Sequence, residues 1–191
     1  MPHEKFDLSR LERLNDESRF KALDPRVLWA ALDTPAPDVI VEIGAGTGLF
    51  ASRFAAMAPQ ATVYAVDMEP EMVAWMSDNR PEVATGALIP LLSSETAVPL
   101  PDGCADVVMM LNVHHELAKP DTTYAQAARL LRSGGRILVA DWSPEAVQER
   151  PPVHVRATAA QLAAALTGSG FKDVIVHEGL PSHCLVTASQ A

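Results

Sequence analysis

Apolar positions along the chain follow two spacings, one typical of buried strands and one typical of helices. Short apolar runs such as VIVEI at 39–43 and ADVVMMLNV at 105–113 are bounded by glycine, proline or aspartate and predict strands. Segments with apolar residues three or four positions apart lie between them and predict helices. The predicted helices cover 25–32, 48–57, 69–78, 120–131 and 158–168, and the predicted strands 39–43, 62–66, 87–92, 105–113 and 136–141.

Continuous apolar strands separated by helices are typical of an α/β fold with a parallel sheet covered on both faces. Two later runs, FKDVIVHEG at 171–179 and SHCLVTAS at 182–189, are joined by the short connection GLPS and predict an antiparallel hairpin at the sheet edge. The SGG sequence at 133–135 is expected to end the preceding helix through a glycine C-cap. We expect a single domain over 1–191, with a helical arm (1–35), a core (36–142) and a C-terminal helix and hairpin (143–191).

Composition supports one globular domain and indicates where the protein is located in the cell. The chain has 191 residues, of which 48% are hydrophobic, enough for a full core. No apolar run approaches the roughly 20 residues of a membrane helix, and the start lacks the apolar block of a signal peptide. We therefore expect a cytoplasmic protein without a membrane partner, and the pattern makes no prediction of its oligomeric state.

The net charge and the cysteine content argue against a nucleic-acid partner, a disulfide framework and a thiolate metal site. The net charge of −9 argues against a nucleic-acid partner, which needs a basic face. The first 26 residues hold six basic and six acidic side chains, so they form a charge-balanced arm. The two cysteines, Cys104 and Cys184, are too few and too distant for a disulfide framework or a thiolate metal site.

The sequence GAGTG after the first strand contains the strongest ligand-binding signal. Glycines are needed where the backbone takes unusual dihedral angles or where a ligand lies against it. Gly44, Gly46 and Gly48 form a G-x-G-x-G pattern, and Leu49 stands where the dinucleotide fingerprint G-x-G-x-x-G has its third glycine. The spacing therefore disfavours a dinucleotide.

Two carboxylates accompany this loop. Glu42, near the end of the first strand, would repel a phosphate but suits a ligand that carries an ammonium group. Asp67 ends the second strand, 19 residues after Gly48, where its carboxylate could accept both hydroxyls of a ribose. Capping of the following helix is the alternative role for Asp67. The combination with Glu42 and the glycine loop favours the ribose.

Five segments together resemble a known family. VEIGAGTG, VYAVDMEPEMV, PLPDGCADVV, RLLRSGGRILVADW and the GF at 170–171 are similar, in order and spacing, to the motifs of class I S-adenosylmethionine-dependent methyltransferases, in particular the ubiquinone/menaquinone C-methyltransferase group. The resemblance spans 39–186 and implies a Rossmann-like three-layer sandwich with a mostly parallel seven-stranded sheet and an antiparallel last strand. It also implies S-adenosylmethionine as cofactor and in-line methyl transfer to a small-molecule acceptor.

The resemblance also implies roles for individual residues. The glycine loop would lie against the methionine part of the cofactor, Asp67 would hold the ribose, and Met68 would pack on the adenine unless it is a core methionine. Many relatives have an acidic residue shortly before LPxPDG that binds the adenine amino group, and Ser94 and Glu95 are the nearest candidates here. The predicted cofactor-binding residues are Glu42, Gly44, Ala45, Gly46, Gly48, Asp67, Met68, Ser94, Glu95 and Asn112.

The acceptor side is expected at the ends of the fourth and fifth strands, because ligands of parallel α/β sheets bind at the carboxyl ends of strands. Methyl transfer needs alignment, and a base if the nucleophile starts protonated. The adjacent His114 and His115 would point in opposite directions on an extended segment, so at most one faces the pocket. We favour His115 as catalytic, with Asp141 as its orienter or a second base. A histidine that only hydrogen-bonds the backbone is the alternative.

A metal site, the role of the N-terminal arm and the choice of function each have more than one interpretation from the sequence. The contiguous H-H-E sequence lacks the i, i+4 spacing of helix-borne metal ligands, so no metal site is predicted, although His154 or His183 could approach in the fold. The N-terminal arm resembles segments that close over the pocket, or it simply packs on the sheet. A nicotinamide-dependent oxidoreductase and a non-catalytic S-adenosylmethionine-binding module are the two alternative functions.

Overall fold

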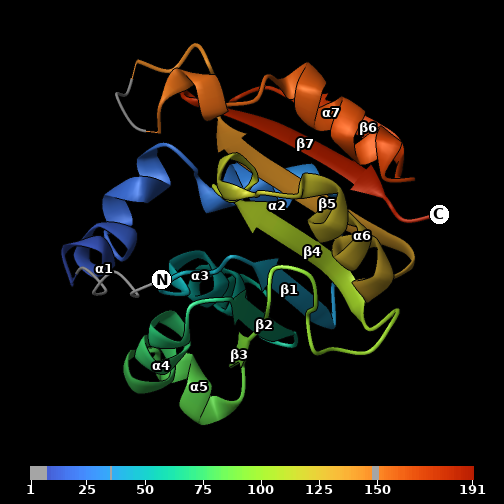
Figure 1. Ribbon diagram of the computed structural model, residues 1–191. Coiled ribbons are helices and arrows are strands. Elements are labelled where there is room, and N and C mark those ends of the chain that lie inside the picture. Colours follow the sequence, from blue (N-terminus) through green and yellow to red (C-terminus); the bar gives the residue numbers. More distant parts are fainter. Residues whose placement is uncertain (1–7, 35, 148–150) are drawn as a thin grey trace.

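A seven-stranded sheet forms the centre of the computed structural model, which describes residues 8–34, 36–147 and 151–191 (Figure 1). The strand order is β3-β2-β1-β4-β5-β7-β6. β7 pairs antiparallel with both β5 and β6, and the other neighbouring strands are parallel. The predicted sheet is confirmed, with β7 placed between β5 and the edge strand β6. The strands are β1 Val39–Ile43, β2 Thr62–Asp67, β3 Leu88–Leu92, β4 Ala105–Leu111, β5 Leu131–Trp142, β6 Lys172–His177 and β7 His183–Ser189.

Helices cover both faces of the sheet, which gives the expected three layers (Figure 1). One apolar cluster joins α2, α3, α4 and α5 to one face, and a second joins α6 and α7 to the other. Every residue of β4 is buried, so the two clusters meet at the central strands. The helices are α2 Pro25–Leu32, α3 Leu49–Met57, α4 Pro70–Asn79, α5 Pro81–Thr85, α6 Pro120–Leu130 and α7 Ala159–Gly168.

An N-terminal arm precedes α2 and consists of α1 (Leu8–Leu14) and the 3₁₀ turn η1 (Glu17–Lys21). Asp16 caps η1 by accepting a hydrogen bond from the Ser18 N–H, and Asp24 caps α2 in the same way through the Arg26 N–H. The arm lies beside the carboxyl ends of β4 and β5 in Figure 1. This placement puts it over the edge of the sheet where ligands of α/β proteins bind.

The predicted glycine C-cap at the end of the helix before β5 is wrong. The helix predicted over 120–131 ends at Leu130 without a glycine cap, because the buried Leu131 already pairs with Ala105 in the sheet. Gly134, with φ +74°, lies in β5 between Leu131 and Arg136, where the register to β4 shifts, so this glycine accommodates the irregular backbone inside the strand.

The predicted strand over 105–113 stops at Leu111. Asn112 takes a left-handed backbone conformation with φ +60°, which ends the extended run. The two histidines that follow lie in a 3₁₀ turn, η2 (His114–Glu116), so the expectation of an extended His114-His115 pair is also wrong.

No helix within 8–34, 36–147 and 151–191 is both long and apolar enough to cross a membrane.

Candidate active site

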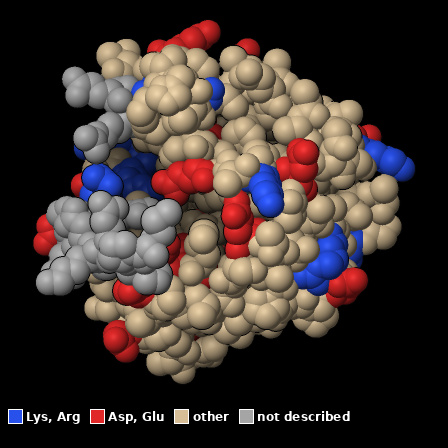
Figure 2. Space-filling view, viewed as in Figure 1, with Lys and Arg blue, Asp and Glu red and all other residues tan. Residues whose placement is uncertain are grey.

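The carboxyl ends of β1, β2, β4 and β5 bring four of the predicted polar residues to one edge of the sheet. Glu42, Asp67, Asn112 and Asp141 lie at or beside these ends. The space-filling view shows this region hollowed between the arm and the sheet, with acidic side chains along it and basic ones on the arm side (Figure 2). The ends of neighbouring strands thus bring these four side chains to one end of the sheet, although the residues are far apart in the sequence.

The glycine loop is tightly packed and conformationally restricted. Gly44, Gly46 and Gly48 all have positive φ, from +56° to +73°. A Cβ on Gly44 would lie 2.5 Å from a methyl carbon of Val113, and one on Gly48 would lie 2.8 Å from the Met76 sulfur. The loop therefore needs glycine both for its dihedral angles and for its contact with the end of β4.

The substitution Gly44→Ala is expected to destabilise the protein by about 2 kcal/mol, because it combines a left-handed φ with a clash against Val113. That loss corresponds to a fall in melting temperature of about 4 to 8 °C for a chain of this size. Thermal unfolding followed by circular dichroism measures it. Gly86→Ala is the control, because Gly86 also has positive φ but its Cβ would meet no atom within 4 Å. Equal losses in the two variants would show that backbone strain alone is responsible.

Glu42 is a buried carboxylate with unused hydrogen-bonding capacity. Its side chain is 1% exposed, and Oε2 makes no hydrogen bond in the structure. Burial raises the pKa of Glu42 to about 8, against the opposing effect of the Arg19 charge. At neutral pH the free protein therefore keeps Glu42 mainly protonated, and a positively charged ligand group beside Oε2 would favour the ionised carboxylate.

Asp67 organises the loop in addition to facing the site. Its Oδ2 accepts a hydrogen bond from the Gly46 N–H at 2.7 Å, and its Oδ1 accepts one from the Glu69 N–H at 3.0 Å. The carboxylate therefore ties the glycine loop to the start of α4. Each carboxylate oxygen can accept a further hydrogen bond, so these contacts leave room for a ribose hydroxyl.

Apolar side chains flank Asp67 at the solvent. Met68 is 54% exposed and Leu92 is 48% exposed, so the alternative of a core methionine is wrong for Met68. Leu92 is the β3 partner of Asp67, which places the two apolar side chains near the same carboxylate. Ser94 and Glu95 lie just beyond β3, where Ser94 is exposed and forms an isolated bridge with Ala97.

The arm is fastened to the glycine loop through Arg80, a residue that the sequence analysis did not single out. Arg80 Nε donates to the Thr47 carbonyl at 2.8 Å, and its Nη2 donates to the side chain of Asn15 in the arm. Arg19 of η1 lies over the Phe50 ring at 5.2 Å, and its positive charge lowers the pKa of both Glu42 and His183. The arm therefore supplies a cation beside the buried carboxylate.

A histidine–aspartate pair lies on the acceptor side. His115 Nδ1 is 2.8 Å from Asp141 Oδ1, and Asp141 is fully buried. Burial alone lowers the pKa of His115, but the hydrogen bond and charge of Asp141 outweigh it and raise the pKa above its ordinary value. In the neutral imidazole, the bond to Asp141 assigns the proton to Nδ1 and leaves Nε2, 3.7 Å from Glu116 Oε1, as a proton acceptor.

His114 points to a different partner. Its Nδ1 lies 2.8 Å from the hydroxyl of Tyr124. Burial raises the pKa of Tyr124 and lowers that of His114, so the hydroxyl donates to a neutral imidazole. The two neighbouring histidines thus have different partners, and only His115 contacts Asp141.

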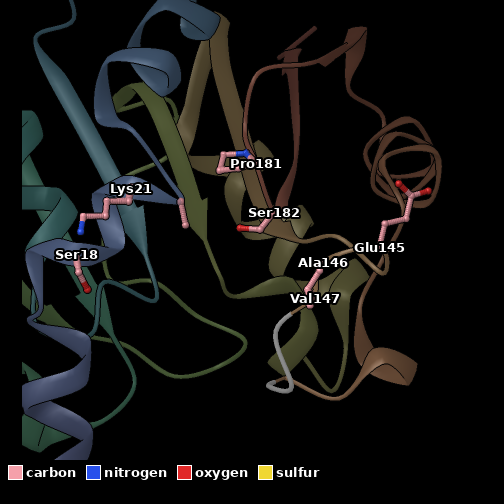
Figure 3. Close-up of a pocket in the computed structure, with 8 residues that line it drawn as sticks. Ser18, Lys21, Glu145, Ala146, Val147, Pro181 and Ser182 are labelled. Atoms are coloured by element: carbon pink, nitrogen blue, oxygen red, sulfur yellow. The ribbon is translucent and has the colours of Figure 1, made fainter.

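A cavity of about 300 Å³ opens between the arm and the C-terminal loops (Figure 3). Ser18, Lys21 and Ala22 form its arm side, and the other side comes from the loops after β5 and before β7. Ser182 in its wall precedes His183, whose ring lies 4.1 Å from that of Trp142. The cavity therefore borders the end of β5, where Asp141 lies.

Among the described residues no group of three or more His, Cys, Asp or Glu side chains could hold a metal ion. His183 contacts Asn112 instead, and His154 is exposed on a separate 3₁₀ turn, η3 (Val153–Val155).

The strand order with an antiparallel β7, and the glycine loop between Glu42 and Asp67, define the Rossmann-like fold of class I methyltransferases. A family model described as a methyltransferase domain matches residues 41–139, more than half of the chain. The chain therefore belongs to this family of S-adenosylmethionine-dependent methyltransferases.

Individual relatives agree with the family. An S-adenosylmethionine-dependent methyltransferase structure from Aquifex aeolicus is 25% identical with a TM-score of 0.88, covering 98% of this chain and 100% of that one. A malonyl-[acyl-carrier protein] O-methyltransferase of Methylococcus capsulatus is 28% identical over 54% of this chain. A demethylmenaquinone methyltransferase of Thermus thermophilus is 31% identical over 57% of it. The chain spans 37% and 49% of the lengths of these two curated relatives.

Proposed function

We propose that this protein transfers a methyl group from S-adenosylmethionine to a small-molecule acceptor, with His115 as the general base and Asp141 as its orienting partner. The observation that carries the proposal is the 2.8 Å contact between His115 and the buried Asp141, at the same sheet edge as the glycine loop. An imidazole with Nδ1 held by a carboxylate presents a basic Nε2 to a substrate.

The residues present fit each part of the cofactor. The unpaired Oε2 of Glu42 suits the ammonium group of the methionine tail, and Arg19 suits its carboxylate. Asp67 would accept the ribose hydroxyls, and the exposed Met68 and Leu92 would cover the adenine faces. Bound S-adenosylmethionine supplies an electrophilic methyl group. In this proposal Gly44, Ala45, Gly46 and Gly48 line the tail, Asn112 borders it, and Ser94 and Glu95 lie on the adenine side.

A base favours certain acceptors over others. A carboxylate is already ionised at neutral pH and needs no proton acceptor, whereas a hydroxyl, an amine or an acidic C–H does. The His115–Asp141 pair therefore supports an acceptor whose nucleophilic atom starts protonated. The resemblance to the ubiquinone/menaquinone C-methyltransferase group fits such an acceptor, and the net charge of −9 supports a small molecule rather than a nucleic acid.

Ligand-induced stabilisation tests the proposal. S-adenosylmethionine and S-adenosylhomocysteine at about 100 times their dissociation constants are expected to add roughly 2.7 kcal/mol, which is about 5 to 10 °C in melting temperature. NAD is expected to add nothing, because the third dinucleotide glycine is absent. Asp67→Asn should reduce the shift, whereas Asp78→Asn, which changes an exposed residue of α4, should leave it unchanged.

The other outcomes separate the alternatives. No shift with either sulfur ligand would overturn the proposal, and a shift with NAD alone would support an oxidoreductase. Binding of S-adenosylhomocysteine without methylated product from any hydroxyl, amine or carbon-acid acceptor would support a non-catalytic binding module.

A further inference from the structure

Asn112 lies where the cofactor and acceptor sides of the site meet. It directly follows β4, whose neighbours in the sheet are β1 and β5. The next residue, Val113, packs against Gly44 of the glycine loop, and the Asn112 N–H donates to the carbonyl of Ala140, next to Asp141. With φ +60°, Asn112 has the conformation that asparagine tolerates better than most residues.

His183 holds the side chain of Asn112 from the opposite end of the chain. Its Nε2 lies 2.9 Å from Asn112 Oδ1, and its Nδ1 lies 3.0 Å from the Ser182 hydroxyl. The ring is 7% exposed and lies against Trp142 at 4.1 Å. Both imidazole nitrogens are therefore in hydrogen-bonding contacts within the protein.

These contacts determine the tautomer of His183. Burial lowers the pKa of His183 to about 4, so the imidazole is neutral at physiological pH. An amide oxygen only accepts hydrogen bonds, so Nε2 must carry the proton, and Nδ1 must accept from Ser182.

The orientation of the Asn112 amide is coupled to this tautomer. If the amide turned by 180°, its NH₂ group would face Nε2, so His183 would have to take the other tautomer and donate from Nδ1 to the Ser182 hydroxyl. In the structure the amide oxygen faces Nε2 at 2.9 Å, which leaves the NH₂ group on the other side. Among the described residues, that NH₂ group has no protein hydrogen-bond partner, and Asn112 is only half-buried, so its donor is available to a ligand oxygen.

We propose that His183 is a positioning residue that locks the Asn112 amide, so that the amide NH₂ donates to the carboxylate of the methionine tail. This inference rests on the proposed function, since it needs the cofactor bound along the glycine loop. The position of Arg19 agrees with it, because the guanidinium charge acts on both Glu42 and His183. The tail carboxylate would then meet one cation and one neutral donor, while Glu42 faces the ammonium group.

Two nucleoside ligands test the inference by isothermal titration calorimetry. S-adenosylhomocysteine carries the amino-acid tail, and 5′-methylthioadenosine lacks it. His183→Leu is expected to weaken S-adenosylhomocysteine roughly tenfold, as for the loss of a hydrogen bond to a charged group, and to leave 5′-methylthioadenosine unchanged. Asn112→Gly, which removes the amide but permits the positive φ, should give the same pattern. The double variant should lose no more than either single variant.

His177→Leu is the matched control. His177 also uses Nε2 in a hydrogen bond, at 2.7 Å to the Thr187 hydroxyl, but it lies on β6 at the far edge of the sheet. It should change neither affinity. Equal weakening of both ligands in His183→Leu, or unchanged S-adenosylhomocysteine affinity in either variant, would overturn the positioning role. Failure of the wild-type protein to bind either ligand would instead overturn the proposed function, and this inference with it.

Discussion

Replacing His115 by alanine is expected to lower kcat for methyl transfer about 100-fold or more, the usual contribution of a positioned general base. The imidazole is the group at the end of β4 whose orientation a buried carboxylate fixes, through the 2.8 Å contact to Asp141. The affinity for S-adenosylhomocysteine should change little, because the proposed cofactor contacts come from other residues. Initial rates with an acceptor found by screening, together with calorimetry of the same variant, measure both effects.

The pH profile gives a second signature of the same role. The pKa of His115 is raised above its ordinary value of 6.5, and only the neutral imidazole can accept a proton. The rate should therefore fall as the pH drops through this raised pKa. Asp141→Asn removes the negative charge that raises the pKa and leaves only a neutral amide oxygen to accept from Nδ1, so the acidic limb should move to lower pH while the maximal rate decreases.

His177→Ala provides the control for both measurements, because it removes a half-buried histidine outside the site. An unchanged kcat in His115→Ala would contradict a base at this position. It would instead favour an acceptor that is already ionised, such as a carboxylate.

Most of the fold could be predicted because local signals agree with the tertiary structure. VIVEI and TVYAVD are apolar runs between turn residues, and both form strands at the predicted positions. The exceptions occur where tertiary contacts override a local signal. Leu131 joins β5 because its side chain is buried against β4, although the following SGG sequence reads as a helix stop.

The candidate site was predictable only where one strand end identifies the residue. Glu42, Asp67 and Asp141 end or nearly end strands, so topology brings them together, and the sequence favoured His115 with Asp141. Arg19, Arg80, Tyr124 and His183 were not given these roles, because their contacts connect segments that no periodicity relates. The His183–Asn112 contact, for example, spans 71 residues of chain.

The substitution Glu42→Gln is expected to have opposite effects on stability and on ligand binding. Burial raises the pKa of Glu42 to about 8 in the folded protein, whereas it is near 4.5 in the unfolded chain. The folded state thus keeps a proton that the unfolded state releases. Wild-type stability therefore falls as the pH rises from about 4.5 to 8 and is constant above that range.

Glutamine does not titrate, so its advantage should be small near pH 5 and fully present at pH 9. There the ligand-free variant should be more stable by about 2 kcal/mol, or roughly 4 to 8 °C in melting temperature. The same change removes the charge proposed to hold the ammonium group, so S-adenosylhomocysteine should bind about 10 to 100 times more weakly.

Melting curves at pH 5 and pH 9 measure the effect of Glu42→Gln on stability, and calorimetry at neutral pH measures its effect on ligand binding. Glu71→Gln, which changes an exposed residue of α4, is the control for both. A variant that is more stable at pH 9 and still binds the ligand normally would show that Glu42 does not contact the cofactor. A variant that binds weakly without gaining stability would show that the buried carboxylate is compensated in the free protein. The expected combination, greater stability with weaker binding, would mean that the fold retains a destabilising buried acid because the ligand requires its charge.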